Sequence, residues 1–288
     1  MTDLSLVVFD VDGTLAETEE AHRQAFDETF AAEGLDWRWS RDDYRRLLRT
    51  TGGKERIRAY LAETGAPGDA VDVAALHAEK TARYVSLLER GGLELREGVA
   101  ELMDAGRTAG LRLAIATTTS RPNVEALCRC CWGRPAEEMF EVIAAGDEVA
   151  AKKPAPDVYT LALARLGIAA EAALALEDSR NGVLAARAAG LRVIVRPSIY
   201  TIGEDFAGAE TVASLAPADL RVFSQVTAAA FGQRRKMLRA SLKKICASPS
   251  AVLGDAQIAE TKRAEQLEIN EFCTLARLID EQNRQPEQ

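Results

Sequence analysis

Short apolar runs alternate with helical segments along the front of the chain. Polar or glycine-containing residues follow each run, and a stretch with helical spacing of apolar positions comes next. Continuous apolar strands separated by helices are typical of a parallel sheet that is covered on both faces. The pattern therefore predicts an α/β fold whose strands are Leu4–Phe9, Leu111–Ala116, Val142–Ala145, Ala173–Leu176 and Arg192–Val195.

The long stretch between the first two of these strands contains no comparable run. Apolar residues recur there at the 3.6-residue spacing of helices. Because an all-helical insertion after the first strand of a parallel sheet indicates a separate cap, we assign residues 1–16 and 93–220 to a core and residues 17–92 to a cap. The expected cap helices are His22–Ala32, Arg41–Arg49, Glu55–Glu63 and Ala74–Arg90.

Charge divides the chain at about residue 220. The 288 residues carry a formal net charge of −8, yet residues 221–288 hold 11 basic and 8 acidic side chains, against 25 basic and 36 acidic in residues 1–220. An acidic body joined to a basic segment indicates two modules. We predict that Ala213–Leu220 forms the joint and that residues 221–288 form a C-terminal helical domain.

This C-terminal domain is expected to open with one long amphipathic helix over Val222–Lys244 and to end with a helix over Ile269–Ile279. Two interpretations remain open for the basic face of residues 221–245: a solvated surface, or a surface that contacts RNA by neutralising phosphates. The apolar stripe of the long helix is expected to consist of Val226, Phe231, Leu238, Leu242 and Ile245.

Composition narrows the class of protein. The chain is 47% hydrophobic and 28% charged, as in ordinary globular proteins, and no apolar run approaches the ~20 residues of a membrane span. No basic leader precedes the first apolar run, so we expect no signal peptide and take the cytoplasm as the default compartment. Five cysteines and two histidines show no spacing typical of a zinc site.

Two carboxylates directly follow the first predicted strand, in the sequence Asp10-Val11-Asp12-Gly13-Thr14. In an open parallel sheet, ligands bind beyond the carboxyl ends of the strands. At that place one carboxylate can attack a substrate while the other moves protons. Taken alone, the motif is equally compatible with a turn at the surface.

Chemically useful residues also follow three later strands. Thr117 ends the second strand in a hydroxyl group, Lys152 and Lys153 follow the third strand, and the acidic pair Glu177 and Asp178 ends the fourth. Phosphoryl transfer requires an in-line nucleophile, neutralised phosphate oxygens and a divalent metal. A nucleophile, a hydroxyl group, a cation and an acidic pair at four strand ends therefore predict a phosphoryl-transfer site.

These motifs resemble those of the haloacid dehalogenase superfamily, in its phosphatase and phosphomutase branch with a helical cap, over residues 4 to about 218. The resemblance implies that Asp10 is the nucleophile that forms an aspartyl-phosphate and that Asp12 is the general acid and base. It further implies that Thr117 hydrogen-bonds the transferring phosphoryl group and that Lys153 balances its charge. The Lys-Pro pairing of the motif favours Lys153 over the neighbouring lysine.

The same resemblance implies a magnesium site. Asp178, supported by Glu177, would hold Mg²⁺ together with the Asp10 carboxylate and the backbone carbonyl of Asp12. An all-oxygen ligand set suits this hard cation.

Substrate specificity in such an architecture is expected to come from the cap, which closes over the site. Glu17, His22, Lys54 and Lys80 are candidates for substrate contacts in the cap, and Thr118 is a candidate in the core. Basic side chains outside the core favour a substrate with two phosphates, or with one phosphate far from the reacting group.

Two details of the cap remain open. Lys54 follows a glycine pair at the start of a predicted helix, which is typical of an anion-binding element but also of a solvated turn. His77 lies three residues before Lys80 on one predicted helix, where both side chains could point the same way; we expect His77 to be exposed.

Within the superfamily, segments such as Thr14–Phe26, Thr51–Ile57 and Glu177–Gly182 look like the CbbY branch. That branch includes phosphatases of xylulose-1,5-bisphosphate. The resemblance therefore implies a Mg²⁺-dependent phosphatase that acts on a phosphorylated sugar. A phosphomutase similar to beta-phosphoglucomutase keeps the same core and is the alternative.

The C-terminal segment resembles a different family, the C-terminal helical domain of ribosomal small-subunit adenine dimethyltransferases. Residues 1–220 offer neither the Gly-rich cofactor loop nor the catalytic motif of those enzymes, so we do not expect methyl transfer. The resemblance implies two joined modules, in which any retained function of the second is RNA contact. Three origins remain open for the joined sequence: a gene fusion, a rearrangement or an artefact of sequence assembly. The likeness is carried by Phe231–Arg239, Ser241–Leu242, Arg263–Leu267 and Phe272–Arg277.

Overall fold

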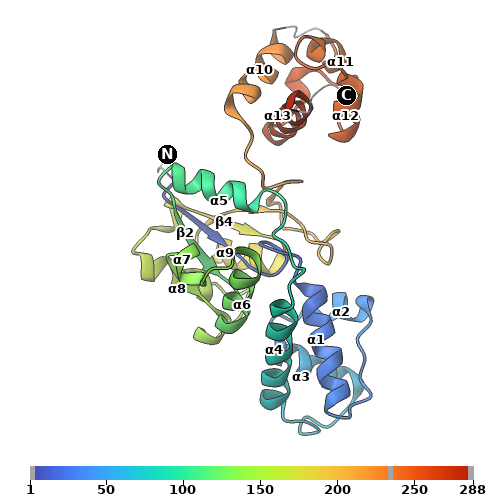
Figure 1. The fold of residues 1–288 in the computed structure, drawn as a ribbon, viewed down its shortest axis with the longest axis vertical. Coiled ribbons are helices and arrows are strands. Elements are labelled where there is room, and N and C mark those ends of the chain that lie inside the picture. Colours follow the sequence, from blue (N-terminus) through green and yellow to red (C-terminus); the bar gives the residue numbers. More distant parts are fainter. Residues whose placement is uncertain (1–3, 233–235, 285–288) are drawn as a thin grey trace. The chain divides into compact units, whose positions relative to one another are not determined.

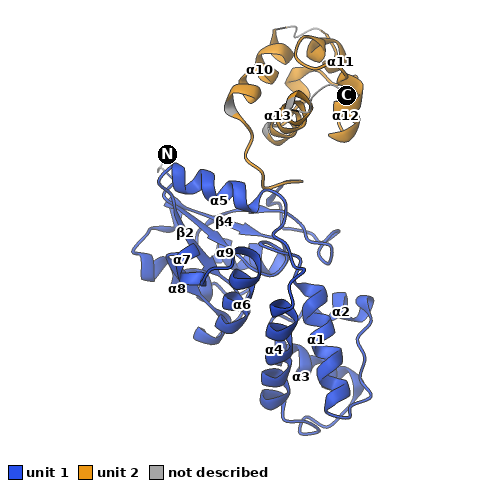
Figure 2. Ribbon diagram, in the orientation of Figure 1, with its two compact units in different colours: residues 1–212 blue, residues 213–288 orange. Residues whose placement is uncertain are grey.

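The computed structural model describes residues 4–232 and 236–284 and divides the chain into two compact units. Unit 1 spans residues 1–212 and unit 2 spans residues 213–288 (Figure 2). No helix within the described ranges has both the length and the apolarity needed to cross a membrane.

Unit 1 contains a six-stranded sheet with the strand order β3-β2-β1-β4-β5-β6, in which every neighbouring pair is parallel. Figure 1 labels β2 and β4 of this sheet. This confirms the predicted α/β fold. The two-residue strand β6 was not predicted, because Glu210 and Thr211 carry no apolar signal. The strands are β1 Leu6–Phe9, β2 Arg112–Ala116, β3 Val142–Ala144, β4 Ala173–Glu177, β5 Arg192–Val195 and β6 Glu210–Thr211.

Helices cover both faces of this sheet. Leu6 and Val8 of β1 pack in one core cluster with side chains of helices α8 and α9. The alternate residues Val7 and Phe9 are also buried, as expected for a parallel sheet, and α5 packs against β2. The helices of this layered core are α5 Val99–Thr108, α6 Arg121–Trp132, α7 Ala136–Met139, η1 Gly146–Glu148, α8 Asp157–Leu166, η2 Ala170–Ala172 and α9 Arg180–Ala188.

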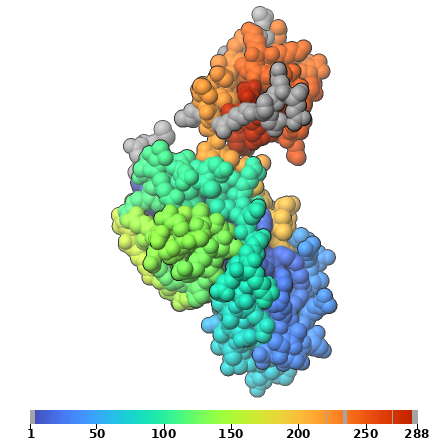
Figure 3. Space-filling view, viewed as in Figure 1, coloured from blue at the N-terminus to red at the C-terminus, as the bar shows by residue number. Residues whose placement is uncertain are grey.

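Four helices between β1 and α5 form the cap of unit 1, and α1 and α4 lie side by side (Figure 3). Ser40 begins α2 with a reciprocal hydrogen-bonded capping box with Asp43, and Asp72 caps the start of α4. Aromatic side chains, among them Phe26 and Trp39, fill the interior. The cap helices are α1 Glu19–Ala32, α2 Arg41–Leu47, α3 Gly53–Thr64 and α4 Val73–Glu89.

Unit 2 is a helical unit with its own apolar core, which includes Val226, Leu238 and Leu242. The predicted long helix is wrong, because α10 ends at Phe231 and the backbone of Met237 is extended. The chain turns so that these apolar side chains meet one another instead of forming a single stripe. The helices are α10 Leu220–Phe231, α11 Leu238–Ser241, η3 Leu242–Lys244, α12 Pro249–Asp255, η4 Ala264–Gln266 and α13 Ile269–Arg284.

The apolar stripe expected in this region is only partly buried. Phe231 is 41% exposed, although its ring stacks on Phe272. Arg234 and Arg235, which belong to the predicted basic face, lie outside the described residues. Arg239 and Lys262 make ion pairs within unit 2, with Glu260 and Glu271.

Candidate active site

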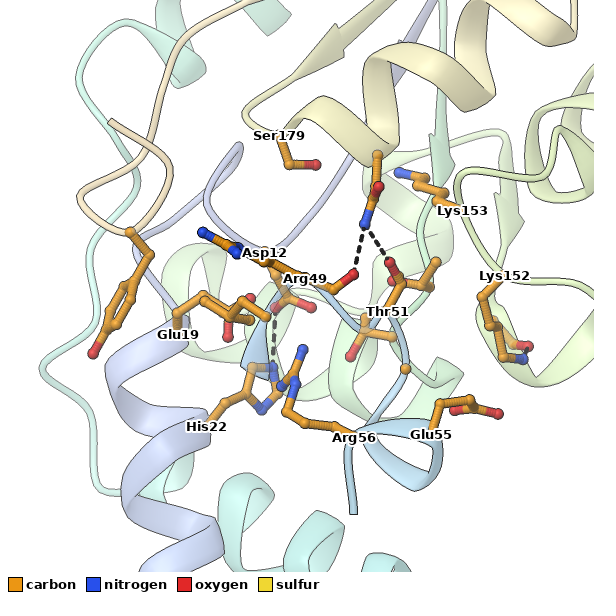
Figure 4. A pocket seen from close by; sticks show the side chains of 18 of the residues that line it. Asp12, Glu19, His22, Arg49, Thr51, Glu55, Arg56, Lys152, Lys153 and Ser179 are labelled. Atoms are coloured by element: carbon orange, nitrogen blue, oxygen red, sulfur yellow. Dashed lines mark hydrogen bonds and ion pairs between the residues drawn. The ribbon is translucent and has the colours of Figure 1, made fainter. Parts of the chain in front are cut away.

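A pocket of about 1320 Å³ lies between the carboxyl ends of the strands and the cap. Asp10, Lys153 and Asp178 line it from the core, and His22 and Lys80 line it from the cap. Figure 4 shows Lys153 and His22 on these two sides of the pocket. The sheet brings the core residues together because β1 lies between β2 and β4, so loops that are far apart in sequence share one edge.

Lys153 connects two carboxylates at the floor of this pocket. Its Nζ donates hydrogen bonds to Asp10 Oδ1 at 2.6 Å and to Glu177 Oε1 at 2.7 Å, and the Tyr159 hydroxyl donates to the same Glu177 oxygen at 2.5 Å. Burial raises the pKa of Asp10 to about 7, although Lys153 opposes this shift. Burial lowers the pKa of Lys153, but the attraction of Asp10 and Glu177 outweighs it, so that pKa is raised.

Lys152 points elsewhere. Its Nζ donates hydrogen bonds to the backbone carbonyls of Gly146 and Val149. The geometry therefore places Lys153, and not Lys152, beside Asp10.

Three buried carboxylates meet next to Lys153. Asp10, Glu177 and Asp178 each offer one oxygen, and these oxygens lie within 4.8 Å of one another. Burial and the charges of Asp10 and Glu177 raise the pKa of Asp178 well above its usual range. One lysine against three desolvated carboxylates leaves negative charge uncompensated, so these oxygens fit a hard divalent cation such as Mg²⁺.

Two glycines make room for the acidic cluster Asp10, Glu177 and Asp178. Gly13 has a φ of +83°, and a Cβ at that position would lie 2.3 Å from Asp178 Oδ2. A Cβ at Gly182, in the first turn of α9, would lie 1.9 Å from Glu177 Oε2. Both positions require glycine because the carboxylates approach the backbone so closely.

The carboxylate of Asp12 faces the cap. Its Oδ1 accepts a hydrogen bond from Thr18 Oγ1 at 2.6 Å and lies 3.1 Å from His22 Nε2 (Figure 4). Burial raises the pKa of Asp12, but the attraction and hydrogen bond of His22, together with the Thr18 hydrogen bond, outweigh burial and lower that pKa to about 2. The carboxylate of Asp12 does not belong to the cluster of Asp10, Glu177 and Asp178, and a metal contact through the backbone carbonyl of Asp12 stays a prediction.

A second buried contact extends this chain of groups. His22 Nδ1 lies 2.6 Å from Lys80 Nζ, and the ring of His22 stacks on Tyr84 with 3.8 Å between centroids. Burial and the nearby Arg56 lower the pKa of Lys80 to about 7, and burial with Lys80 lowers the pKa of His22. Asp12, His22 and Lys80 are therefore connected groups that can exchange protons.

The two predicted threonines occupy different places. Thr117 is buried, and its Oγ1 accepts a hydrogen bond from the Thr119 backbone at 3.1 Å. Thr118 lines the pocket, whereas Thr117 is absent from the lining. The end of β2, the neighbour of β1, therefore presents the hydroxyl-bearing Thr118 to the pocket, and the role predicted for Thr117 stays a prediction.

The remaining cap candidates also differ from one another. Lys54 is exposed and lines the pocket, whereas Glu17 is absent from the lining and pairs with Arg96 at 3.1 Å. His77 is not exposed as predicted. It is half-buried in the pocket wall, close enough to Gly53 that a Cβ there would lie 2.3 Å from His77 Nε2.

Sequence reasoning missed several residues that hold the site in place. Tyr159 and Thr18 donate to carboxylates of the site, and Arg96 donates to the carbonyls of Gly13 and Pro197. Thr18, six residues after Asp12, carried a usable signal because it begins the first cap helix. Tyr159 and Arg96 carried none, since only the fold brings them to the site.

Comparisons with known proteins agree with this geometry. The sequence model of the haloacid dehalogenase-like hydrolase family matches residues 4–190, and the chain belongs to that family and is a phosphatase enzyme. It is 59% identical, over 72% of its own length and 92% of the relative's, to protein CbbY of Rhodobacter capsulatus. A crystal structure of CbbY from Rhodobacter sphaeroides, mutant D10N with xylulose-1,5-bisphosphate, shares 56% identity and a TM-score of 0.72, covering 74% of this chain and 95% of that one.

A short segment is similar to a different protein. Over 63 residues the chain is 56% identical to ribosomal RNA small subunit methyltransferase A of Cereibacter sphaeroides. This match covers 22% of the chain and 23% of that methyltransferase. This match supports the resemblance of the C-terminal segment to part of a ribosomal RNA methyltransferase. It spans less than a quarter of that enzyme.

Proposed function

We propose that the chain is a Mg²⁺-dependent phosphatase that removes phosphate from a sugar bisphosphate of the xylulose-1,5-bisphosphate type. The observation that carries this proposal is the contact of Asp10 with Lys153, beside Glu177 and Asp178, at the floor of a pocket that the cap closes. The relative crystallised with that bisphosphate supports the choice of substrate.

In the first step, an oxygen of Asp10 attacks phosphorus and forms an aspartyl-phosphate, while the sugar oxygen leaves with a proton from Asp12. In the second step, Asp12 takes a proton from water, the water attacks the phosphoryl group, and phosphate and Asp10 are released. Lys153 offsets the charge of the phosphoryl oxygens. Asp10 and Asp178, supported by Glu177, would hold Mg²⁺, which when bound neutralises these carboxylates and keeps Asp10 ionised.

Asp12 must be ionised to accept a proton in the second step, and its low pKa keeps it ionised. For the first step Asp12 must carry a proton. A bound phosphate places negative charge beside Asp12 and so raises its pKa. His22 and Lys80 are connected to Asp12 and can supply that proton.

The cap side of the pocket supports a substrate with a second phosphate. Arg49 and Lys54 both line the pocket, and both are exposed. Neither makes an ion pair within the described ranges of the chain, unlike Arg45 and Arg46, which pair with Asp42 and Glu63. Two cations without an ion pair to any residue that the structure describes can bind a phosphate distant from Asp10.

The test is to incubate the full chain with xylulose-1,5-bisphosphate and a panel of sugar monophosphates, with Mg²⁺ or with a chelator. We expect release of inorganic phosphate that stops when Mg²⁺ is removed. Formation of an isomeric sugar phosphate without free phosphate would instead support the phosphomutase alternative. Absence of phosphate release from every bisphosphate would contradict the proposal.

RNA contact by residues 221–245 stays a prediction, as does a cytoplasmic location. The similarity of a short segment to a ribosomal RNA methyltransferase motivates the RNA prediction. A salt-sensitive mobility shift of small-subunit ribosomal RNA fragments with the full chain would test it.

A further inference from the structure

The core segment Ser198–Thr201, which follows β5, reaches into the cap. Tyr200 is 5% exposed and belongs to the aromatic cluster of the cap, with its ring nearly perpendicular to that of Tyr44 at 5.7 Å. Among the buried members of that cluster, Tyr200 is the one that the core supplies. A core side chain therefore completes the interior of the cap.

Hydrogen bonds reinforce this insertion. The Tyr200 hydroxyl donates to Glu20 Oε2 at 2.5 Å, and the Ile199 amide donates to Glu17 Oε2 at 3.3 Å. Arg45 of the cap donates to the Ile199 carbonyl at 3.4 Å, and its guanidinium lies 5.8 Å from the centre of the Tyr200 ring. These contacts join the cap to this core segment.

The next residue of the same segment holds the acidic cluster. Thr201 Oγ1 donates to the backbone carbonyl of Asp178 at 2.7 Å and lies 3.4 Å from Asp178 Oδ2. The hydroxyl of Ser198 hydrogen-bonds to the Asp178 carboxyl group and lies 3.0 Å from Thr201 Oγ1. Two consecutive residues thus contact the cap and the candidate metal ligand.

We propose that Ser198–Thr201 couples closure of the cap to the metal site, with Tyr200 as a positioning residue for the cap and Thr201 as a positioning residue for Asp178. This inference rests on the proposed phosphatase function. If substrate binds the closed form, its apparent affinity is proportional to the closed fraction. Loss of the Tyr200 contacts therefore raises KM and leaves kcat nearly unchanged, because saturating substrate closes the cap again.

The first test compares Tyr200→Phe, Tyr200→Ala and Ile199→Ala in hydrolysis of xylulose-1,5-bisphosphate. Ile199→Ala is the matched control, because the cap contacts of Ile199 are made by its backbone, and its side chain is 53% exposed and is absent from the pocket lining. We expect KM to rise about tenfold in Tyr200→Phe, because this variant loses one hydrogen bond to a charged group. KM should rise further in Tyr200→Ala. If Tyr200→Ala does not fold, Tyr200→Phe decides. A KM like that of the control, or a loss confined to kcat, would overturn the proposal.

The second test measures Mg²⁺ binding by calorimetry and needs no turnover. Thr201→Val should weaken binding about tenfold, as is usual for outer hydrogen-bond partners of metal ligands, and Thr201→Ser should restore it. Tyr200→Phe should weaken Mg²⁺ binding about fivefold through the coupling, while Ile199→Ala should not. Unchanged Mg²⁺ affinity in Tyr200→Phe would refute the coupling. If wild-type protein bound Mg²⁺ but released no phosphate, the proposed function alone would fail.

Discussion

The two units of the chain differ in whether they bury charged side chains. Within the described residues of unit 2, Ser241 is the only buried polar side chain, and the rest of the interior is apolar. Unit 1 has an equally apolar sheet interior. Among the described residues of unit 1, the buried Asp, Glu, His, Lys and Arg side chains all line or adjoin one pocket: Asp10, His22, Arg56, Lys80, Lys153, Glu177 and Asp178.

This difference separates packing from function. Burying a charge destabilises a fold unless partners compensate. Unit 1 buries charged side chains in one place, where the strand ends meet the cap. The described residues of unit 2 bury none. Substitutions of matched type in the two units should therefore have opposite or very unequal effects.

The largest contrast is expected at Asp10. Asp10→Asn removes the nucleophile and should reduce phosphate release by about 10⁴-fold or more, in line with the loss of other catalytic nucleophiles, while the protein stays folded. Asp255→Asn, at an exposed position of unit 2, should leave turnover unchanged. Phosphate release and circular dichroism of both variants check this. Mg²⁺-dependent turnover in Asp10→Asn would rule out the mechanism.

Adding one methyl group to a glycine should also distinguish the units. In Gly182→Ala the new Cβ overlaps Glu177 Oε2, so we expect activity to fall about 100-fold and stability to fall by about 1–3 kcal/mol. In Gly254→Ala, within α12, nothing lies within 4 Å, and the helix should gain about 0.5–1 kcal/mol. Thermal melting and kcat/KM of the two variants provide the comparison. Normal activity in Gly182→Ala would show that the position of Glu177 is unimportant.

A buried lysine should make unit 1 sensitive to pH. The pKa of Lys80 is lowered to about 7, first by burial, so the unfolded chain binds a proton that the native state lacks between about pH 7 and the usual lysine range. Native stability therefore rises with pH in that window, and the cost of a charged Lys80 is fully present below pH 7. Lys80→Met removes this cost, so the free energy of unfolding of the variant should exceed that of wild type by about 1–3 kcal/mol at pH 6. The melting temperature of the variant should therefore be higher than that of wild type at pH 6, and the difference should shrink by pH 9.

The matched substitution in unit 2 is Lys262→Met, which breaks a partly exposed pair with Glu271. It should cost less than about 1 kcal/mol and show no comparable change with pH. A Lys80→Met gain that is the same at pH 6 and pH 9 would mean that Lys80 does not titrate between them.

Much of the fold was predictable from local pattern. The apolar runs identified all strands of the sheet except β6, and the predicted cap helices agree with the observed ones to within three residues. Unit 2 was harder, because a periodic stripe cannot reveal where a helix stops. Its long helix breaks after Phe231, and the Leu238 amide instead donates to Lys262, a partner that the local sequence does not indicate.

The residues of the site also fall into those that the sequence predicts and those that it does not. Asp10, Lys153 and Asp178 follow strands, so strand order alone predicts that they meet. Tyr200 and Arg96 act through contacts between distant segments, and no local pattern indicates such contacts. Sequence thus predicts the chemistry of the pocket better than the residues that hold it closed.

The smallest effect is expected from removing unit 2 altogether. Unit 1 has its own core, and the pocket is lined by residues of unit 1. The match to the family model, over residues 4–190, also lies within unit 1. Deleting Ala213–Gln288 should therefore leave kcat/KM within about twofold, since sites without shared partners contribute independently. The full chain, assayed in parallel with circular dichroism of both forms, is the control. A folded truncated protein with collapsed turnover would show that unit 2 contributes to the reaction, and the division between a charged, catalytic unit and an apolar, packing unit would have to be abandoned.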